Sequence, residues 1–210
     1  MKRLVILGGG ESGVGAALLG KDKKYEVFLS DSGKIDKKYK DVLIHNGIEW
    51  EDGTHTESKI LGADLVVKSP GIPDQVSIVK KLRNAAISVV SEIEFAATFT
   101  SGNIIGITGS NGKTTTTMMV YHILRQAGLD VAMGGNIGES FAKQVINDTS
   151  NYVLELSSFQ LDGIQSFRPH IAVITNITPD HLDRYDHKFE NYIDSKFRIV
   201  MNQTSKDYLL

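Results

Sequence analysis

Short apolar runs alternate with longer amphipathic stretches along the whole chain. The apolar runs are rich in β-branched residues and are continuous, which is typical of parallel strands buried on both faces. These runs predict strands at Leu4–Leu7, Glu26–Ser30, Asp64–Lys68, Ser88–Val90, Ile104–Thr108, Asp130–Met133, Tyr152–Leu156 and His170–Asn176, with another strand beginning near Asp207.

The stretches between the runs have the 3.6-residue period of helices. Helices are expected over residues 14–19, 36–46, 77–86, 92–99, 114–127 and 189–201. Gly47 and Gly128 follow two of these stretches, where glycine commonly ends a helix. The regular alternation of strand and helix predicts an α/β fold with mostly parallel sheets.

The best candidate for a domain boundary is the polar segment Thr100–Asn103. A helix is expected to end there, and a new buried strand follows it. The chain of 210 residues is therefore divided into two α/β units, 1–100 and 101–210. The second unit looks incomplete because its last residues resemble the beginning of a strand.

The composition of the chain argues against several classes of function. The chain has 23 Lys and Arg against 25 Asp and Glu, a net charge of −2, which argues against nucleic acid as the main partner. It has 0 cysteines, which excludes a disulfide framework, a cysteine-ligated metal and a cysteine nucleophile. No apolar run is long enough for a membrane span, and the apolar start is too short for a signal peptide. A cytoplasmic protein is expected.

The first candidate site is a glycine pattern after the first strand. Gly8, Gly10 and Gly13 fit G-x-G-x-x-G, and Asp31 ends the second strand. Backbone N–H groups in such a turn, at the start of a helix, can bind a diphosphate, while the acid can accept hydrogen bonds from a ribose or a base. The pattern does not say whose nucleotide binds, and a purely structural turn remains an alternative. The turn Ser69-Pro70-Gly71 is likewise either a ligand-binding turn or a purely structural one.

The second candidate site is a phosphate loop between a strand and a helix. Backbone N–H groups of such a loop bind phosphates, Lys113 would neutralise the β- and γ-phosphates, and a Thr hydroxyl would reach Mg²⁺. Position 107 is Ile where the common pattern has Gly, so this is a shorter variant. The loop consists of Gly109, Ser110, Asn111, Gly112, Lys113, Thr114 and Thr115.

Polar residues also follow the later strands of the second unit. Glu155 lies within an apolar strand, and a buried carboxylate is costly unless it is paired or bound to a cation. Mg²⁺ is the expected partner, and pairing with a core arginine or capping a helix are the alternatives. His181 lies in the polar segment Thr178–Tyr185. Lys196 would, in isolation, be an ordinary surface lysine.

Five motifs in this order resemble the Mur ligases, the ATP-dependent amide ligases of peptidoglycan precursor synthesis. The residues that carry the resemblance are Thr108–Thr115, Gly134–Gly138, Leu154–Leu161 and Thr178–Tyr185, with the glycine turn before them. The motifs are most similar to those of the members that add D-glutamate.

The resemblance implies a Rossmann-like first domain that binds the UDP part of the substrate. The implied contacts of the UDP-linked substrate are Gly10, Glu11, Ser12, Gly13, Asp31, Ser32, Ser69 and Gly71, with Asn136, Ser157 and Gln160 near its muramoyl-peptide end. It also implies a P-loop ATPase-type second domain, of which this chain has about half.

The resemblance also implies ATP and two Mg²⁺ ions in the second domain. Its implied metal ligands are Thr115, Glu155, His181 and Lys196, the last as a carbamylated lysine, and its implied catalytic residues are Lys113, His181, Lys196 and Asn136. In the implied reaction the carboxylate of UDP-N-acetylmuramoyl-L-alanine attacks ATP to form an acyl phosphate, which the amine of D-glutamate converts to an amide.

The implied enzyme is longer than this chain and is expected to be a monomer. The chain alone is therefore expected to be inactive as a ligase. Three other interpretations remain: an NAD-dependent oxidoreductase that uses the glycine pattern, a non-catalytic nucleotide-binding module, and a related ligase that adds another amino acid.

Overall fold

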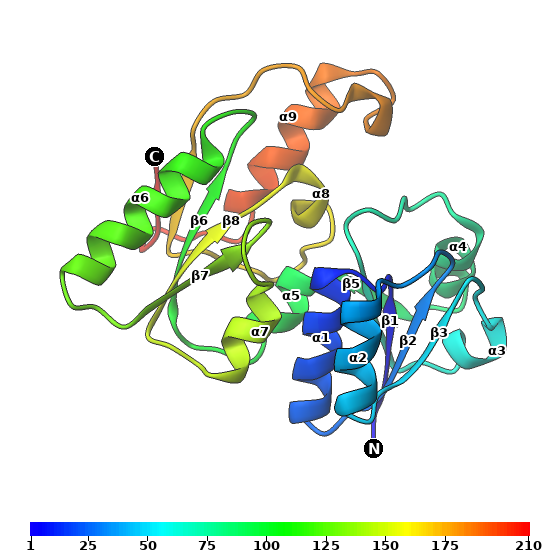
Figure 1. Cartoon of the computed structure of the whole chain (residues 1–210). Helices are drawn as coiled ribbons and strands as arrows, with labels where there is room; N and C mark the ends of the chain where they lie inside the picture. The colour runs from blue at the N-terminus through cyan, green and yellow to red at the C-terminus, as the bar shows by residue number, and fades with distance from the viewer.

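The chain forms two parallel five-stranded sheets in a computed structural model that describes residues 1–210 (Figure 1). The first sheet has the order β3-β2-β1-β4-β5, and the second has the order β10-β9-β6-β8-β7. Every strand pair is parallel. The predicted α/β class with mostly parallel sheets is confirmed.

The elements of the first sheet lie between residues 3 and 97. Its strands are β1 (Arg3–Leu7), β2 (Glu26–Asp31), β3 (Glu49–Asp52), β4 (Leu65–Lys68) and β5 (Ser88–Ser91). Its helices are α1 (Glu11–Asp22), α2 (Lys37–His45), α3 (Glu57–Ile60), α4 (Ser77–Asn84) and α5 (Glu92–Ala97).

The elements of the second sheet begin at residue 103. Its strands are β6 (Asn103–Thr108), β7 (Val131–Gly135), β8 (Asn151–Glu155), β9 (Ile171–Ile174) and β10 (Tyr208–Leu209). Its helices are α6 (Lys113–Gln126), α7 (Phe141–Ile146), α8 (Ser158–Leu161) and α9 (Phe189–Phe197), with short 3-10 turns at Leu182–Arg184 and Arg198–Val200.

The central strand of each sheet leads directly into a glycine-rich turn. β1 lies in the middle of the first sheet and β6 in the middle of the second, and both are buried. Since the strands are parallel, the polar residues at the carboxyl ends of their neighbours gather at the same edge. The two candidate phosphate turns are therefore placed at the ligand-binding edges of the two sheets.

Helix α7 joins the two halves of the chain. It packs against α1 and α5 of the first half, as Figure 1 shows. Phe141 and Val145 of α7 belong to the same buried apolar cluster as Ala17 and Phe95, which lie on α1 and α5. The hydrophobic core is thus continuous between the two sheets.

Four elements were missed in the sequence, among them α7, whose 6 residues are too few to show a clear helical period. Strand β3 reads Glu-Trp-Glu-Asp, with no apolar run, because it forms an edge of its sheet where charges are tolerated. Helices α3 and α8 have only 4 residues each, too few to show a helical period. No helix of the structure combines the length and apolar character that crossing a membrane requires.

Candidate functional site

The glycine turn of the first half is held by an acidic side chain from the neighbouring strand. Asp31 Oδ2 accepts a hydrogen bond from the Gly9 amide at 2.6 Å, and Oδ1 accepts one from the Gly33 amide at 2.7 Å. Gly13 must be glycine, because a Cβ there would lie 1.9 Å from the Gly8 carbonyl oxygen. Asp31 therefore shapes the turn that carries Gly10, Glu11 and Ser12 at the start of α1.

The Ser69-Pro70-Gly71 turn faces the glycine turn from the end of β4. The Ser69 hydroxyl is buried and has no hydrogen-bond partner in the protein, and it lies where a Cβ on Gly8 would collide with it. A buried hydroxyl without a partner is unfavourable unless a ligand completes it. Ser32 and Gly71 are exposed at the same edge of the sheet. The residues predicted for the UDP end are thus brought together.

The side chain of Glu11 is directed away from this turn. Its Oε1 accepts hydrogen bonds from Lys143 Nζ at 2.6 Å and from the Ser140 amide at 3.3 Å. Although partial burial alone would raise it, the pKa of Glu11 is lowered by Lys143 and by the Ser140 amide. Only the backbone amide of Glu11 is therefore free to face a ligand in the turn.

The phosphate loop of the second half contains two lysines at one carbonyl. Gly109 and Gly112 have φ values of +144° and +81°, in the region that favours glycine. Lys113 Nζ donates to the carbonyls of Gly109 and Ser110, each at 2.9 Å. Lys196 Nζ donates to the same Gly109 carbonyl at 2.7 Å. Two cations at the start of α6 form an electropositive site for an anion.

Lys196 is buried despite its charge. Its exposed fraction is 1%, and its ammonium lies 4.6 Å from the centre of the Tyr192 ring. Burial, with a further contribution from the charge of Lys113, lowers the pKa of Lys196 to about 8. A larger fraction of this amine is neutral near neutral pH than for an exposed lysine, which makes it more nucleophilic.

Glu155 is a buried carboxylate without a cationic partner. Its exposed fraction is 2%, its Oε2 accepts from Thr114 Oγ1 at 2.6 Å, and its Oε1 accepts from Asn136 Nδ2 at 2.8 Å. Asn136 and Glu155, which are both predicted site residues, are thus in direct contact. The hydroxyl beside Glu155 belongs to Thr114, whereas Thr115, one of the four implied metal ligands, has no hydrogen bond to Glu155.

This arrangement fits Mg²⁺ held together with a nucleotide. No group of three or more His, Asp or Glu side chains in the structure is arranged to hold a metal ion. Mg²⁺ is commonly held by one or two carboxylates together with substrate phosphates and water. One uncompensated carboxylate and one hydroxyl beside a phosphate loop match that description.

His181 lies apart from the Glu155 cluster. It has a left-handed backbone conformation with φ of +50°, its ring is 5.2 Å from that of Phe159, and its Nε2 is 3.5 Å from Asp180 Oδ2. No hydrogen bond joins it to Glu155, Lys113 or Lys196. The charge of Asp180 acts on Lys196, which places this loop near the buried amine.

Ser157 and Gln160 have a structural role at the start of α8. Each satisfies a polar group of the other in a capping box, in which the Ser157 hydroxyl accepts from the Gln160 amide. The Gln160 side-chain oxygen accepts from the Ser157 amide at 3.0 Å. These contacts fix the turn that follows Glu155.

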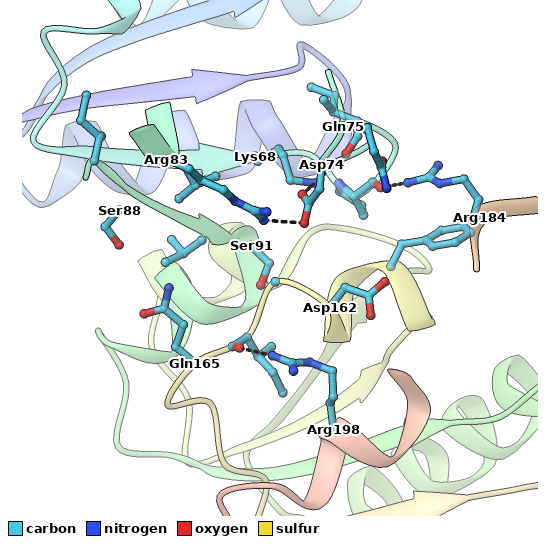
Figure 2. A pocket seen from close by; sticks show the side chains of 18 of the residues that line it. Lys68, Asp74, Gln75, Arg83, Ser88, Ser91, Asp162, Gln165, Arg184 and Arg198 are labelled. Atoms are coloured by element: carbon cyan, nitrogen blue, oxygen red, sulfur yellow. Dashed lines mark hydrogen bonds and ion pairs between the residues drawn. The ribbon is translucent and has the colours of Figure 1, made fainter. Parts of the chain in front are cut away.

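A groove of about 670 Å³ runs between the halves, along the free edge of β5 (Figure 2). Lys68 and Arg83 lie on one side of it and both contact Asp74, while Arg198 approaches from the other half. The groove is bordered by Pro70 but contains none of the predicted site residues. It therefore adjoins the Ser69-Pro70-Gly71 turn without including the two glycine turns.

Two carboxylates that the sequence did not single out connect the halves. Glu94 accepts hydrogen bonds from the amides of Gln165, Ser166 and Phe167 and from the Ser166 hydroxyl. Burial would raise the pKa of Glu94, but these donors lower it. Glu92 is buried, accepts only from the Ala142 amide, and has a pKa raised by burial to about 8. The apolar stretch around them, Glu-Ile-Glu-Phe-Ala-Ala, was the available signal of buried acids.

A phosphate loop with two lysines, a neighbouring carboxylate and hydroxyl, and a second glycine turn on a separate sheet are together typical of nucleotide-binding α/β proteins. Two family profiles match the chain: "MurD N-terminal domain" over residues 3–78 and "Mur ligase middle domain" over residues 107–210. The chain belongs to the Mur ligase family.

Relatives of known name agree with this assignment. The chain is 63% identical over 210 residues to UDP-N-acetylmuramoylalanine–D-glutamate ligase of Christiangramia forsetii, covering 100% of this chain and 47% of the relative. It is 57% identical to the protein of that name in Bacteroides fragilis, covering 99% of this chain and 47% of the relative. The chain thus spans about half the length of these relatives.

Solved structures show the same fold. A UDP-N-acetylmuramate:L-alanyl-gamma-D-glutamyl-meso-diaminopimelate ligase from Neisseria meningitides aligns with a TM-score of 0.70 at 22% identity, over 100% of this chain and 70% of that chain. The UDP-N-acetylmuramate-alanine ligase MurC from Thermotoga maritima aligns with a TM-score of 0.63 at 22% identity, over 96% of this chain and 47% of that chain.

Proposed function

We propose that this chain is the UDP- and ATP-binding part of a ligase that adds D-glutamate to UDP-N-acetylmuramoyl-L-alanine. The observation that carries the proposal is the cluster of Lys113, Lys196, Thr114 and Glu155 around one phosphate loop. The names of the relatives, at 57% to 63% identity, supply the substrates. Residues 1–100 form the proposed UDP-binding domain, and residues 101–210 form the proposed ATP-binding domain.

The UDP-linked substrate is proposed to bind across the ends of β1, β2 and β4. The backbone amides of Gly10, Glu11, Ser12 and Gly13 bind the diphosphate, while Asp31 and Ser32 face the uridine. Ser69 and Gly71 close the site from β4, and the unsatisfied Ser69 hydroxyl supports this role. Asn136, Ser157 and Gln160 lie toward the muramoyl-peptide end.

ATP is proposed to bind at the loop Gly109–Thr115. The loop amides hold the phosphates, and Lys113 leaves the carbonyls of Gly109 and Ser110 to contact the β- and γ-phosphates. Glu155 and the Thr114 hydroxyl would hold Mg²⁺, with Thr115 next to them in the chain. Mg²⁺ at this position would neutralise charge on the phosphates.

His181 and Lys196 are proposed to serve the reacting end of the substrate. The neutral amine of Lys196 can add to CO₂ and lose a proton, which gives a carbamate in place of the ammonium. With His181, that anion would hold a second Mg²⁺. The lowered pKa of Lys196 supports the carbamate, because only the neutral amine adds to CO₂.

The reaction itself is mainly a matter of positioning. The substrate carboxylate attacks the γ-phosphorus, the bond to the β-phosphate oxygen breaks, and ADP leaves. The amine of D-glutamate then attacks the acyl carbon, phosphate leaves, and the nitrogen loses a proton. Lys113 stabilises charge on the transferred group, and Asn136 keeps Glu155 in place. A cytoplasmic monomer is the proposed state.

The proposed function is tested by phosphate release from a protein that carries this chain at the full length of its relatives. Release should require UDP-N-acetylmuramoyl-L-alanine, Mg·ATP and D-glutamate together. Lys113→Ala should abolish release and leave binding of the UDP substrate intact. Dependence on an amino acid other than D-glutamate would instead support a related ligase, and NAD binding in preference to UDP would contradict the proposal.

A further inference from the structure

The amino end of α7 is held by two acidic side chains from the other half of the molecule. Glu11, in the glycine turn, binds the Ser140 amide and the Lys143 ammonium. Glu92, at the start of α5, binds the Ala142 amide. Both carboxylates thus satisfy amides that a helix start leaves free.

Helices α1 and α7 approach each other closely. A Cβ on Gly15 of α1 would lie 1.8 Å from the Ser140 hydroxyl oxygen, and Ser140 is fully buried. Phe141 next to it is also fully buried and packs edge-on against Tyr152 of β8. A shift of the glycine turn relative to α7 would therefore be transmitted to the second half.

A short, firmly bonded loop leads from α7 back to the ATP site. The Gly135 amide donates to the Glu139 carbonyl at 3.2 Å, and the Asn136 amide donates to the Glu155 carbonyl at 2.8 Å. A Cβ on Gly135 would lie 2.3 Å from that same Glu155 carbonyl. Asn136 and Glu155 are therefore fixed to the residues that precede Ser140.

We propose that Glu11 and Lys143 are positioning residues that couple the first glycine turn to the metal-binding end of the phosphate loop. The coupling runs from Glu11 through Ser140 and Lys143, along the loop 135–139, to the Asn136–Glu155–Thr114 contacts. A diphosphate bound at the amides of the turn would fix the start of α1, and Glu11 would pass this restraint to α7 and thereby to Asn136. The inference rests on the proposed function, because it takes UDP and Mg·ATP as the two ligands.

The expected coupling is modest and favourable. Each ligand should raise the affinity for the other by the same factor, since coupling between two binding sites is reciprocal. The Glu11–Lys143 pair is partly exposed, with side chains 33% and 23% accessible, so a factor of about 5 is expected, at the low end of usual couplings.

The test is calorimetry on this chain with UDP and a non-hydrolysable Mg·ATP analogue, each titrated alone and in the presence of the other. Glu11→Gln and Lys143→Met should each bring the coupling factor close to 1, and the double variant should lose no more than either single variant. Lys143→Arg keeps the charge and should keep the coupling. Glu57→Gln, which breaks the Lys81–Glu57 ion pair within the first half, is the matched control and should keep it too.

A second measurement does not depend on ligands. Hydrogen exchange of the Ser140 amide, which donates to Glu11, should be faster in Glu11→Gln than in the wild type, with the strands of the second sheet unchanged. Unchanged exchange at this amide, or a coupling factor of 1 in the wild type with both ligands bound, would overturn the inference and leave the proposed function standing. Absence of UDP binding would overturn both.

Discussion

The two glycine-rich turns occupy equivalent places in their sheets and differ in charge. Each follows the central strand and precedes a long helix. The first turn is held together by Asp31. Lys143 is the ammonium near this turn, and it is paired with Glu11. The second turn contains Lys113 and Lys196, whose ammonium groups donate hydrogen bonds to carbonyl oxygens and have no carboxylate partner.

This difference indicates two tasks for one kind of turn. Backbone amides alone suit a diphosphate that is bound without reacting and is also held through its base and sugar. Lysines suit a triphosphate on which charge develops during transfer. In the proposed function, the same local backbone arrangement would serve recognition in one half and reaction in the other.

Replacing Lys113, in the second turn, should have the largest effect on ligand affinity. Lys113→Ala should weaken binding of a non-hydrolysable Mg·ATP analogue by about 100-fold, since a charge-assisted phosphate contact contributes roughly 1.5–3 kcal/mol. Affinity for UDP, measured by calorimetry on the same protein, should not change. Lys80→Ala, at an exposed lysine of the first half, is the control. An equal loss of affinity for both ligands would mean that the two turns are not separate sites.

The carboxyl group of Glu92, which lies between the two halves, should make the free energy of unfolding depend on pH. The pKa of Glu92 is raised in the folded protein to about 8, so the folded state binds a proton that the unfolded state releases above about pH 4.5. Stability is therefore highest at low pH with respect to this group and falls by up to about 1.4 kcal/mol per pH unit as pH rises toward 8.

Glu92→Gln should remove this contribution. Its melting temperature relative to the wild type should rise steadily between about pH 5 and about pH 8. Thermal unfolding followed by circular dichroism at several pH values measures the effect, with Glu57→Gln as an exposed control. A difference that stays constant with pH would show that Glu92 is charged in the folded protein.

Removing the hydrogen bonds that hold the first turn should lower the affinity for UDP only. Asp31→Ala removes both acceptors of the Gly9 and Gly33 amides and should weaken UDP binding about 10-fold, as expected for the loss of about 1.4 kcal/mol. The Mg·ATP analogue should bind as before. Asp31→Asn keeps one acceptor and should lose less affinity, whereas equal losses in both variants would show that the negative charge itself is required.

The smallest expected difference between the two turns is in how strongly salt reduces ligand affinity. Raising NaCl from about 0.05 M to about 0.5 M should reduce affinity for the Mg·ATP analogue several-fold more than affinity for UDP, because free lysines respond to screening more than amides do. Titrations of both ligands at several NaCl concentrations and constant pH give the slope of each affinity against salt concentration. Equal slopes would contradict the contrast in charge between the turns.

The sequence allowed most of the fold and both turns to be predicted. Continuous apolar runs and glycine spacing report locally on strands and turns, so β1, β6 and the residues between Gly109 and Thr115 could be located without a structure. Edge strand β3 could not, since its stability comes from pairing with β2 and its own residues are charged.

The contacts between distant segments could not be predicted in the same way. Nothing local to Lys143 indicates that its partner is Glu11, which is 132 residues away. The hydroxyl beside Glu155 is that of Thr114, a choice between adjacent threonines that depends on how α6 is rotated about its axis. Tertiary packing decides both, and neither leaves a local pattern in the sequence.

The central claim, that the two turns are separate sites for two different nucleotides, is tested most directly by the stoichiometry of mixed binding. Saturating this chain with the Mg·ATP analogue and then titrating UDP should show one UDP bound per chain with no displacement of the analogue. Lys113→Ala should still bind one UDP. Displacement of the analogue by UDP, or preference of the first turn for NAD over UDP, would contradict the claim.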